Sequence, residues 1–477
     1  MQKVLTVSQM RAADSYTINH LHIPSQKLMR RAGAAIADEV AIAADKNHAN
    51  KILVVCGTGN NGGDGYVCAK ELKKRGYNVA VYSIEGNLSP DCAREKATYD
   101  GVYTEDISAD IIVDCLFGTG LCRPVSGKYA EVIEKINQTN AYVISADIPS
   151  GLNGDSGLAE GCAVKADITV AIAELKLGYF LNDGYDFCGT VIKKDIGITC
   201  PEDNYTQIFD DSDIKNFYPK RKRNSHKGTF GTAQIIAGSK RYVGAAVLAA
   251  ESALKSGCGY VKLNTYPQDT AALAAKLPQV IYSDDIDYSA NCIAVGPGCG
   301  VSEALYNTIS SLLNSYKGAL IIDADGLNAV SEYGVSVLTD KMCEVVLTPH
   351  IKEFSRLSGL DVAEILSDPV MHARHFANKH QVTVLLKSAT SILTDGEKVF
   401  LLHKGNSALA KGGSGDMLTG YACGTAARGV DGFNAVAVAA YTLGLAAEIC
   451  AADRTEYCVT SKDLIKNLHL AVRSLTY

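Results

Sequence analysis

Several signatures of specialised protein classes are missing from this sequence of 477 residues. Its 15 cysteines are scattered and form no CxxC pair, so they are expected to be reduced, buried side chains rather than a disulfide framework. No GxxxxGK[ST] segment is present, which argues against a P-loop NTPase. The formal net charge of −6 argues against nucleic acid as a partner, because binding phosphates needs clustered Lys and Arg.

Long apolar segments are also missing. The first residues, MQKVLTVSQMRAADSY, contain no stretch suited to a signal peptide. The longest apolar run, Ala435 to Ala447, is too short to cross a bilayer. We therefore expect a cytoplasmic protein that does not bind membranes.

What is present is typical of a soluble α/β protein with two domains. Hydrophobic residues make up 47% and charged residues 21% of a chain roughly three times the usual length of one domain. Apolar runs alternate with segments of helical period in both halves, which predicts parallel sheets with helices on both faces. A polar stretch after residue 200 and the basic run Pro219–Gly228 separate the halves, so we expect domains at 1–205 and 215–477. The basic run is interpreted as a solvated linker.

A glycine-rich segment, Gly57-Thr-Gly-Asn-Asn-Gly-Gly-Asp-Gly65, follows the first predicted strand of the N-terminal half, Lys51–Cys56, and precedes a predicted helix, Gly65–Arg75. It contains GxGxxG, so a nicotinamide dehydrogenase with Glu85 as the ribose-binding acid is a competing interpretation. Two asparagines and Asp64 stand where a pyrophosphate would favour backbone N–H groups alone, which argues against it. A capped glycine turn without function is the remaining alternative.

Two further strand ends of this half bear polar residues. Asp114 precedes the turn Phe117-Gly-Thr-Gly-Leu121, and Asp147 begins Asp147-Ile-Pro-Ser-Gly151. Ligands of open parallel sheets bind outside the carboxyl ends of the strands, so these groups are expected to converge on one site.

These motifs closely resemble the NAD(P)H-hydrate epimerase domain, which implies a Rossmann-like, three-layer αβα fold and an enzyme that interconverts the R and S hydrates of NADH and NADPH. By this resemblance Asp147 contacts the nicotinamide end and is the candidate acid/base. A potassium ion would be held by Asn61, Asp114 and Ser150, which offer hard oxygen ligands. The implied substrate contacts are Asn60, Asn61, Gly62, Gly63, Asp64, Gly118, Thr119, Gly120, Leu121, Cys122, Arg123, Pro124 and Asp147.

The most informative motif of the C-terminal half is Gly412-Gly-Ser-Gly-Asp416, directly ahead of a predicted helix from Met417. Backbone N–H groups of such a loop can bind a phosphoryl group, and Asp416 is placed to accept a proton from an attacking hydroxyl. His350 and Glu353 could ligate a metal, although no third ligand is apparent, and a substrate contact by His350 is preferred. Asp323 and Asp325 could bind a cation or form a turn.

Together with Gly296-Pro-Gly-Cys-Gly300 and Leu386-Lys-Ser-Ala-Thr-Ser391, this motif resembles the ribokinase-like fold, and most closely the nucleotide-dependent NAD(P)H-hydrate dehydratase family. The resemblance implies that the hydrate hydroxyl is phosphorylated, and that the ring nitrogen then expels phosphate to restore the dihydronicotinamide. Asp416 is the implied base. Implied hydrate contacts are Ala245, Gly298 or Gly300, His350 and Asp416, and implied nucleotide contacts are Lys387, Ser388, Ala389, Thr390, Ser391 and Gly415.

The predicted function is thus a bifunctional metabolite-repair enzyme that joins both activities. The resemblance favours ADP as phosphoryl donor, with Mg²⁺ bridging its phosphates, and we expect a homo-oligomer. Ser388 and Ala408 stand where many relatives have Gly, which bears on nucleotide affinity rather than on reaction class. Alternatives are a ribokinase-like vitamin-precursor kinase with a regulatory N-terminal domain and a non-catalytic scaffold that binds RNA or proteins.

Overall fold

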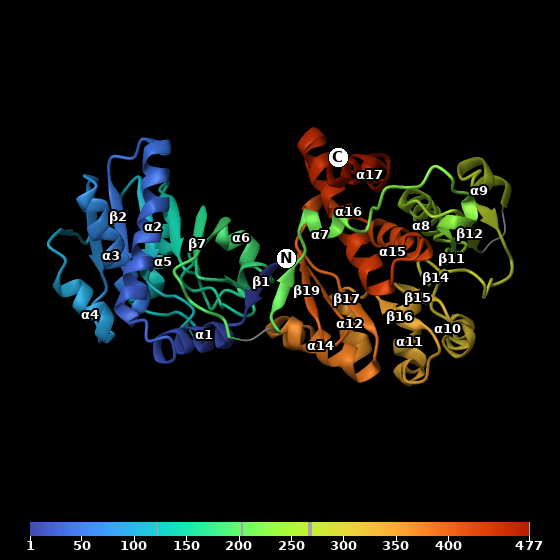
Figure 1. The fold of residues 1–477 in the computed structure, drawn as a ribbon, viewed down its shortest axis with the longest axis horizontal. Helices are drawn as coiled ribbons and strands as arrows, with labels where there is room; N and C mark the ends of the chain where they lie inside the picture. The colour runs from blue at the N-terminus through green and yellow to red at the C-terminus, as the bar shows by residue number, and fades with distance from the viewer. Residues whose placement is uncertain (122, 202–203, 266–269, 477) are drawn as a thin grey trace. The chain divides into compact units, whose positions relative to one another are not determined.

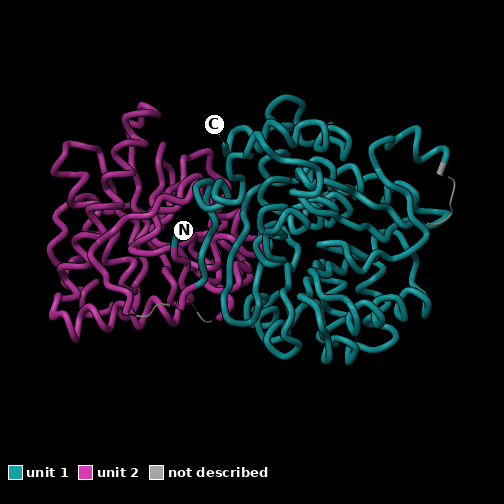
Figure 2. Tube along the Cα trace, turned by 45° about the vertical axis from the view of Figure 1, so that its right-hand side comes forward, with its two compact units in different colours: residues 1–2, 206–477 teal, residues 3–205 magenta. Residues whose placement is uncertain are grey.

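The computed structural model describes residues 1–121, 123–201, 204–265 and 270–476. Its contacts divide the chain into two compact units, coloured separately in Figure 2. Residues 3–205 form the N-terminal unit, and residues 206–477 with residues 1–2 form the C-terminal unit. Each unit is built around its own sheet and is described separately below.

The N-terminal unit contains a seven-stranded parallel sheet in the order β4-β3-β2-β5-β6-β7-β9. Strand residues alternate between two cores because successive side chains point to opposite faces. Ile52 and Val54 pack with the helix residues of α2 and α3, whereas Leu53 and Val55 pack with those of α5. The strands are β2 (Ile52–Cys56), β3 (Val79–Ser83), β4 (Val102–Tyr103), β5 (Ile111–Cys115), β6 (Tyr142–Ala146), β7 (Ile168–Ile172) and β9 (Thr190–Lys194).

Helices on both faces complete three layers in this unit. They are α1 (Val7–Asn19), α2 (Ser25–Asn47), α3 (Asn60–Lys74), α4 (Pro90–Ala97), α5 (Lys128–Gln138) and the short α6 (Gly184–Cys188). Beside the main sheet, β1 (Gln2–Leu5) pairs in parallel with β8 (Leu175–Lys176), with Leu5 opposite Lys176. Figure 1 shows α2 and α3 packed together, as their contacts also indicate.

The start of α3 differs from the sequence prediction. The helix begins at Asn60 rather than Gly65, so Asn60–Asp64 form its first turn and not a loop. The turn from β2 is tight: a Cβ on Gly62 would lie 2.1 Å from the Gly57 carbonyl oxygen. The glycines of this motif therefore let α3 pack directly on the strand ends, which places the polar side chains of its first turn at the carboxyl edge of the sheet.

The C-terminal unit has a larger sheet in the order β13-β12-β11-β14-β15-β16-β17-β18-β19-β10. Its pairs are parallel except for those of β18, which is antiparallel to both neighbours. The strands are β10 (Thr206–Ile208), β11 (Thr232–Ile236), β12 (Tyr260–Asn264), β13 (Ile281–Tyr282), β14 (Cys292–Val295), β15 (Ala319–Ile322), β16 (Glu344–Leu347), β17 (Thr383–Leu386), β18 (Ser391–Thr394) and β19 (Val399–Leu402).

Helices cover both faces of this sheet as well (Figure 1). One side has α8 (Val243–Ser256), α15 (Ser414–Ala427), α16 (Gly432–Arg454) and α17 (Ser461–Thr476), whose apolar residues share one core. The other side has α10 (Glu303–Ser315), α11 (Asp325–Tyr333), α12 (Ile351–Ser358) and α14 (Pro369–His380). Short α7 (Asp211–Lys215), α9 (Thr270–Lys276) and α13 (Val362–Ser367) complete the unit. The predicted α/β class is confirmed.

One helix, α16, is long and apolar enough to cross a membrane by length and composition alone. It extends beyond the apolar run noted in the sequence to 23 residues, and 67% of its most apolar window is buried inside the unit. Its alanine and valine side chains belong to the core shared with α8 and α15. That packing is the arrangement of a core helix in a globular domain.

Candidate active sites

A cavity of about 820 Å³ lies at the carboxyl ends of β2, β5 and β6 in the N-terminal unit. It is the place where ligands bind in open parallel sheets. Nine of the predicted residues line it: Asn60, Asn61, Asp64, Gly118, Thr119, Gly120, Leu121, Arg123 and Asp147. Gly62, Gly63 and Pro124 are not among the lining residues, and Cys122 lies outside the described residues. The convergence expected from the sequence therefore occurs for most of the set.

Asp147 is held in an unusual position at the end of β6. Its φ of +66° lies in the left-handed region, where a residue other than glycine is strained. The Lys176 ammonium lies 2.5 Å from the Asp147 carboxylate, and the Tyr179 hydroxyl donates to the Asp147 carbonyl at 2.5 Å. Lys176 is buried and also donates to the Ile172 carbonyl at 2.7 Å. The carboxylate is thus fixed at the cavity wall by a buried cation.

The three predicted potassium ligands lie together behind this wall. Asp114 is fully buried and accepts hydrogen bonds from the Ser150 hydroxyl at 2.6 Å and the Ser150 amide at 2.8 Å. Burial raises the pKa of Asp114, and these hydrogen bonds lower it in part. Asn61 donates to the carbonyls of Phe117 at 2.8 Å and Ala146 at 3.3 Å, while its own buried oxygen has no partner. An unpaired buried acceptor beside a buried carboxylate suits a cation.

Two more carboxyl groups face the same cavity. Burial raises the pKa of Asp64 well above its ordinary value, with further contributions from Asp147 and Asp14. Burial and the Asp147 carboxylate raise the pKa of Asp14 on α1, whereas Lys176 lowers it. Three of the four carboxyl groups that line the cavity therefore repel one another beside one buried lysine, an arrangement in which protons are readily held and exchanged.

In the C-terminal unit, Asp416 lies in the first turn of α15, which begins at Ser414 and not at the predicted Met417. The helix is capped by Gly413, whose φ of +97° suits glycine. Burial, together with the Asp323 and Asp325 carboxylates, raises the pKa of Asp416 to about 6, while Lys387 lowers it. A carboxylate with that pKa is ionised at neutral pH and basic enough to accept a proton.

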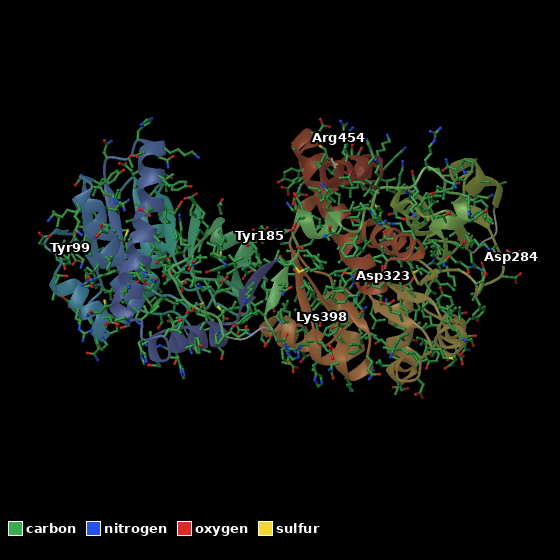
Figure 3. All side chains as sticks on the ribbon, viewed as in Figure 1. Tyr99, Tyr185, Asp284, Asp323, Lys398 and Arg454 are labelled. Atoms are coloured by element: carbon green, nitrogen blue, oxygen red, sulfur yellow. The ribbon has the colours of Figure 1, made fainter. Side chains whose placement is uncertain are left out.

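Lys387 and Asp323 form an ion pair beside this helix end. The Lys387 ammonium lies 2.8 Å from one Asp323 oxygen, and the Thr419 hydroxyl of α15 donates to the other at 2.6 Å. Asp323, labelled in Figure 3, is buried. A Cβ on Gly415 would lie 3.6 Å from the Lys387 ammonium, so the cation faces the backbone of the glycine loop. Burial alone would lower the pKa of Lys387, but Asp323 and Glu353 outweigh it and raise that pKa.

Other predicted dehydratase residues surround this pair at the carboxyl edge of the sheet. Gly298 packs against Ala245, since a Cβ on Gly298 would lie 2.9 Å from that of Ala245. The Gly300 amide donates to Asp325 at 2.8 Å, so Asp325 is engaged in a turn. His350 caps α12, and its ring accepts from the Glu353 amide at 3.2 Å. Among the described residues no group of three His, Cys, Asp or Glu side chains could hold a metal ion.

The predicted nucleotide segment 387–391 leads from β17 into β18. The Lys387 amide donates to the Pro349 carbonyl at 2.8 Å, which ties the segment to the His350 turn. The Ser388 hydroxyl donates to the Thr390 carbonyl, which holds this turn closed. The Thr390 and Ser414 hydroxyls are buried without a partner. The Ser414 hydroxyl in the glycine loop and the Thr390 hydroxyl in this turn are therefore available to bind phosphate oxygens.

Sequence reasoning missed Lys176, Asp14, Arg11 and Thr419, and it left the role of Asp323 open. Lys176 had one usable signal, a single charged residue between Leu175 and Leu177. The partner of Asp323 lies 64 residues away, and no local pattern indicates such a pairing. Arg11 and Asp14 belong to an ordinary amphipathic helix, where charged residues are expected.

Comparison with known proteins agrees with this geometry. A family model described as NAD(P)H-hydrate dehydratase matches residues 233–470, and one described as YjeF-related protein N-terminus matches residues 25–178. The bifunctional NAD(P)H-hydrate repair enzyme Nnr of Thermofilum pendens is 34% identical, over 99% of this chain and 97% of that protein. This chain belongs to the family of bifunctional NAD(P)H-hydrate repair enzymes. The protein of the same name from Moorella thermoacetica is 31% identical, over 99% and 97% of the two chains.

Solved structures resemble the C-terminal unit. The ADP/ATP-dependent NAD(P)H-hydrate dehydratase of Bacillus subtilis, co-crystallised with ATP and Mg²⁺, is 28% identical with a TM-score of 0.52. The match covers 57% of this chain and 99% of that chain. The predicted family and ribokinase-like C-terminal fold of this NAD(P)H-hydrate repair enzyme are confirmed, and its N-terminal YjeF-related domain is Rossmann-like.

Proposed function

We propose that the N-terminal unit equilibrates the R and S hydrates of NADH and NADPH, and that the C-terminal unit dehydrates the S form with ADP as phosphoryl donor. The observation that supports this most is the pair of carboxylates at equivalent sheet edges of separate units. Asp147 faces a cavity large enough for a sizeable part of a dinucleotide, and Asp416 begins a helix behind a glycine loop.

In the N-terminal unit, Asp147 exchanges protons with the oxygen on the hydrated ring carbon as water leaves and returns. The hydroxyl-bearing carbon is bonded to the ring nitrogen, whose lone pair assists departure of water, and water can return to either face. Lys176 fixes the Asp147 carboxylate toward the cavity, so the carboxylate is preorganised for proton transfer. Gly118, whose Cβ would lie 3.2 Å from the Asp147 carboxylate, leaves room for the ring beside it.

Potassium is proposed to bind at Asn61, Asp114 and Ser150. The unpaired buried oxygen of Asn61 and the buried carboxylate of Asp114 are the observations that fit a hard cation. A bound cation would supply positive charge that offsets the Asp114 carboxylate and would hold the 117–118 turn in place. We expect potassium to raise the thermal stability of the epimerase unit in wild type and not in Asn61→Ala, as followed by calorimetry. Equal stabilisation of both proteins would reject the site.

In the C-terminal unit, Asp416 accepts the proton of the hydrate hydroxyl as that oxygen attacks the terminal phosphoryl group. The amides of Gly413–Gly415 at the positive end of α15 stabilise the charge on the phosphoryl oxygens, and Lys387 faces the same loop. Mg²⁺, when bound to the nucleotide, would neutralise further phosphate charge. The phosphate ester formed is a better leaving group than hydroxide, so the ring nitrogen lone pair expels phosphate and forms a carbon–nitrogen double bond. Loss of a proton from the neighbouring ring carbon to water then restores the dihydronicotinamide.

The function is tested with a mixture of both hydrates, offered with ADP, with ATP or with no nucleotide. Recovery of the dihydronicotinamide absorbance is expected in the presence of Mg²⁺ with ADP, and it should reach completion because epimerisation feeds the S form. Recovery of only the S fraction would contradict the epimerase assignment. Recovery without any nucleotide, or with ATP but not with ADP, would contradict ADP as the phosphoryl donor.

We also propose that the enzyme works in the cytoplasm. The 14 cysteines of the described residues are all free, and most are buried. Free thiols in this number are typical of a reducing compartment. A cell fractionation that places the protein in an oxidising compartment would contradict this location.

A further inference from the structure

Helix α1 presents one face to the epimerase cavity, and no role has been given to it. Met10, Arg11, Asp14 and Ile18 all line the cavity. Their spacing of one, three and four residues places them on one side of the helix. The family model that matches this unit begins at residue 25, so α1 lies ahead of the matched region. The cavity therefore includes side chains that lie outside the segment matched by this family model.

Several contacts fix α1 against the cavity wall. The Val7 amide donates to the Asp155 carboxylate at 2.7 Å, and the Arg11 guanidinium donates to the Thr119 carbonyl at 3.4 Å. A capping box between Thr6 and Gln9 starts the helix. Because Thr119 belongs to the loop of predicted substrate contacts, α1 is tied to that loop and holds Asp14 in a defined place.

Asp14 shares the cavity lining with charged groups from five other elements. These are Asp64 on α3, Asp91 on α4, Asp147 after β6, Lys176 on β8 and Arg123 in the loop after β5, with Arg11 on its own helix. Partial desolvation by the cavity wall, followed by the Asp147 carboxylate, disfavours ionisation of Asp14 and outweighs the opposite effect of Lys176, so the pKa of Asp14 is raised. Asp147 differs from Asp14 because it has Lys176 as a direct partner. Two carboxyl groups in one cavity with such different partners are suited to acid and base roles.

We propose that Asp14 is a second catalytic residue of the epimerase site, the acid that protonates the departing hydroxyl of the hydrate. The proton passes from the Asp14 carboxyl to that oxygen, the carbon–oxygen bond breaks, and water leaves. The ring nitrogen lone pair forms the carbon–nitrogen double bond. Water then adds to the other face, its oxygen bonds to the carbon, and Asp147 accepts the released proton. This role rests on the proposed epimerase function.

Asp14 suits the acid role better than Asp64 does. Its side chain is exposed at the cavity, whereas Asp64 is more enclosed in the first turn of α3. Each turnover returns the enzyme with the proton on Asp147 rather than on Asp14, so the acid must be reloaded from solvent. A group at the open side of the cavity can exchange that proton through water.

The test follows hydrate repair in the intact chain, using Asp14→Asn and, as a charge-matched control, Asp38→Asn on the exposed side of α2. With ADP or ATP present, whichever wild type uses, and Mg²⁺, the dehydratase of each variant consumes the S hydrate in a fast phase. The slow phase then reports epimerisation of the R hydrate. We expect Asp14→Asn to lower kcat of the slow phase by about 100-fold with KM little changed. The wild-type rate should fall as pH rises through the raised pKa of Asp14, and the rate of Asp14→Asn should lose that fall.

A chemical-rescue arm separates catalysis from structure. Formate should restore part of the slow phase in Asp14→Ala, because a small acid can enter the open cavity, and should leave Asp38→Asn unchanged. A slow phase of Asp14→Asn within about threefold of wild type, a loss confined to KM, or no rescue by formate would overturn the role. If Asp14→Asn does not fold, Asp14→Glu decides: its rate must keep the fall with rising pH. Recovery in wild type that stops at the S fraction would instead reject the epimerase function.

Discussion

The Lys387 ammonium and the Asp323 carboxylate lie 2.8 Å apart beside the glycine loop that begins α15. Their charges act in opposite directions on Asp416: Asp323 raises its pKa and Lys387 lowers it. Because Thr419 holds the second oxygen of Asp323, the pair is fixed to the same helix that presents the base. The pKa of Asp416 and the position of the Lys387 ammonium are therefore set by one connected group of side chains.

The first prediction concerns the pH dependence of the dehydratase. Asp416 must be ionised to accept a proton, so kcat should fall as pH drops through about 6, the pKa of this carboxyl. Lys387→Met removes a charge that lowers this pKa and should move the midpoint upward. Asp325→Asn removes a charge that raises it and should move the midpoint downward. Shifts of the same sign in both variants would show that Asp416 is not the titrating base.

The second prediction concerns stability at the same residue. A carboxyl group whose pKa is about 6 in the folded state and near its ordinary 3.8 when unfolded binds more protons when folded between those values. Folding stability then decreases as pH rises from about 4 to 6. Asp416→Asn should therefore stabilise the C-terminal unit by about 2–3 kcal/mol at neutral pH and by little at pH near 3. Denaturant unfolding at the two pH values provides the measurement, and equal effects at both would contradict it.

The third prediction separates two glycines of the first motif. Gly62→Ala should destabilise the N-terminal unit by about 1–3 kcal/mol, because its Cβ would meet the Gly57 carbonyl oxygen at 2.1 Å. Gly59→Ala should fold normally, since no atom lies within 4 Å of its added Cβ and its φ is −86°. Thermal melts of the two variants test this. Similar melting temperatures would show that the turn relaxes around the added carbon.

The fourth prediction concerns the buried lysine of the epimerase cavity. Lys176→Met leaves the Asp147 carboxylate and the Ile172 carbonyl without their partner, so we expect a loss of about 3–5 kcal/mol in stability together with loss of epimerisation. Lys193→Met is the matched control, because its ion pair with Glu174 is more exposed and should matter by less than about 1 kcal/mol. A Lys176→Met protein as stable as the control would mean that the pair does not hold the cavity wall.

Much of the fold was predictable because buried strands leave a strong local pattern. The predicted strand Lys51–Cys56 differs from β2 only at its first residue, and Asp114 and Asp147 do lie at neighbouring strand ends. Helix starts were less accurate at both glycine motifs. Glycine and asparagine weaken the helical pattern at Asn60 and Gly415, although the tight turns there require those residues.

The side chains that tune the two sites were harder to predict. Lys176 lies 29 residues from Asp147, and Lys387 lies 64 residues from Asp323, so each pair meets only through the order of the strands. Asp14 reaches the cavity because of how α1 packs on the unit. The spacing of residues along the helix does not by itself show which side of α1 faces the cavity. Such interactions depend on tertiary structure and have no local sequence signal.

The division of labour between the two units is tested most directly by single-site variants in the intact chain, assayed on mixed hydrates with Mg²⁺ and ADP. Asp416→Asn should abolish recovery of the dihydronicotinamide while R and S hydrates still interconvert. Asp147→Asn should recover the S fraction at the normal rate and leave the R fraction unchanged. Loss of both activities in either folded variant would contradict the account of two independent active sites.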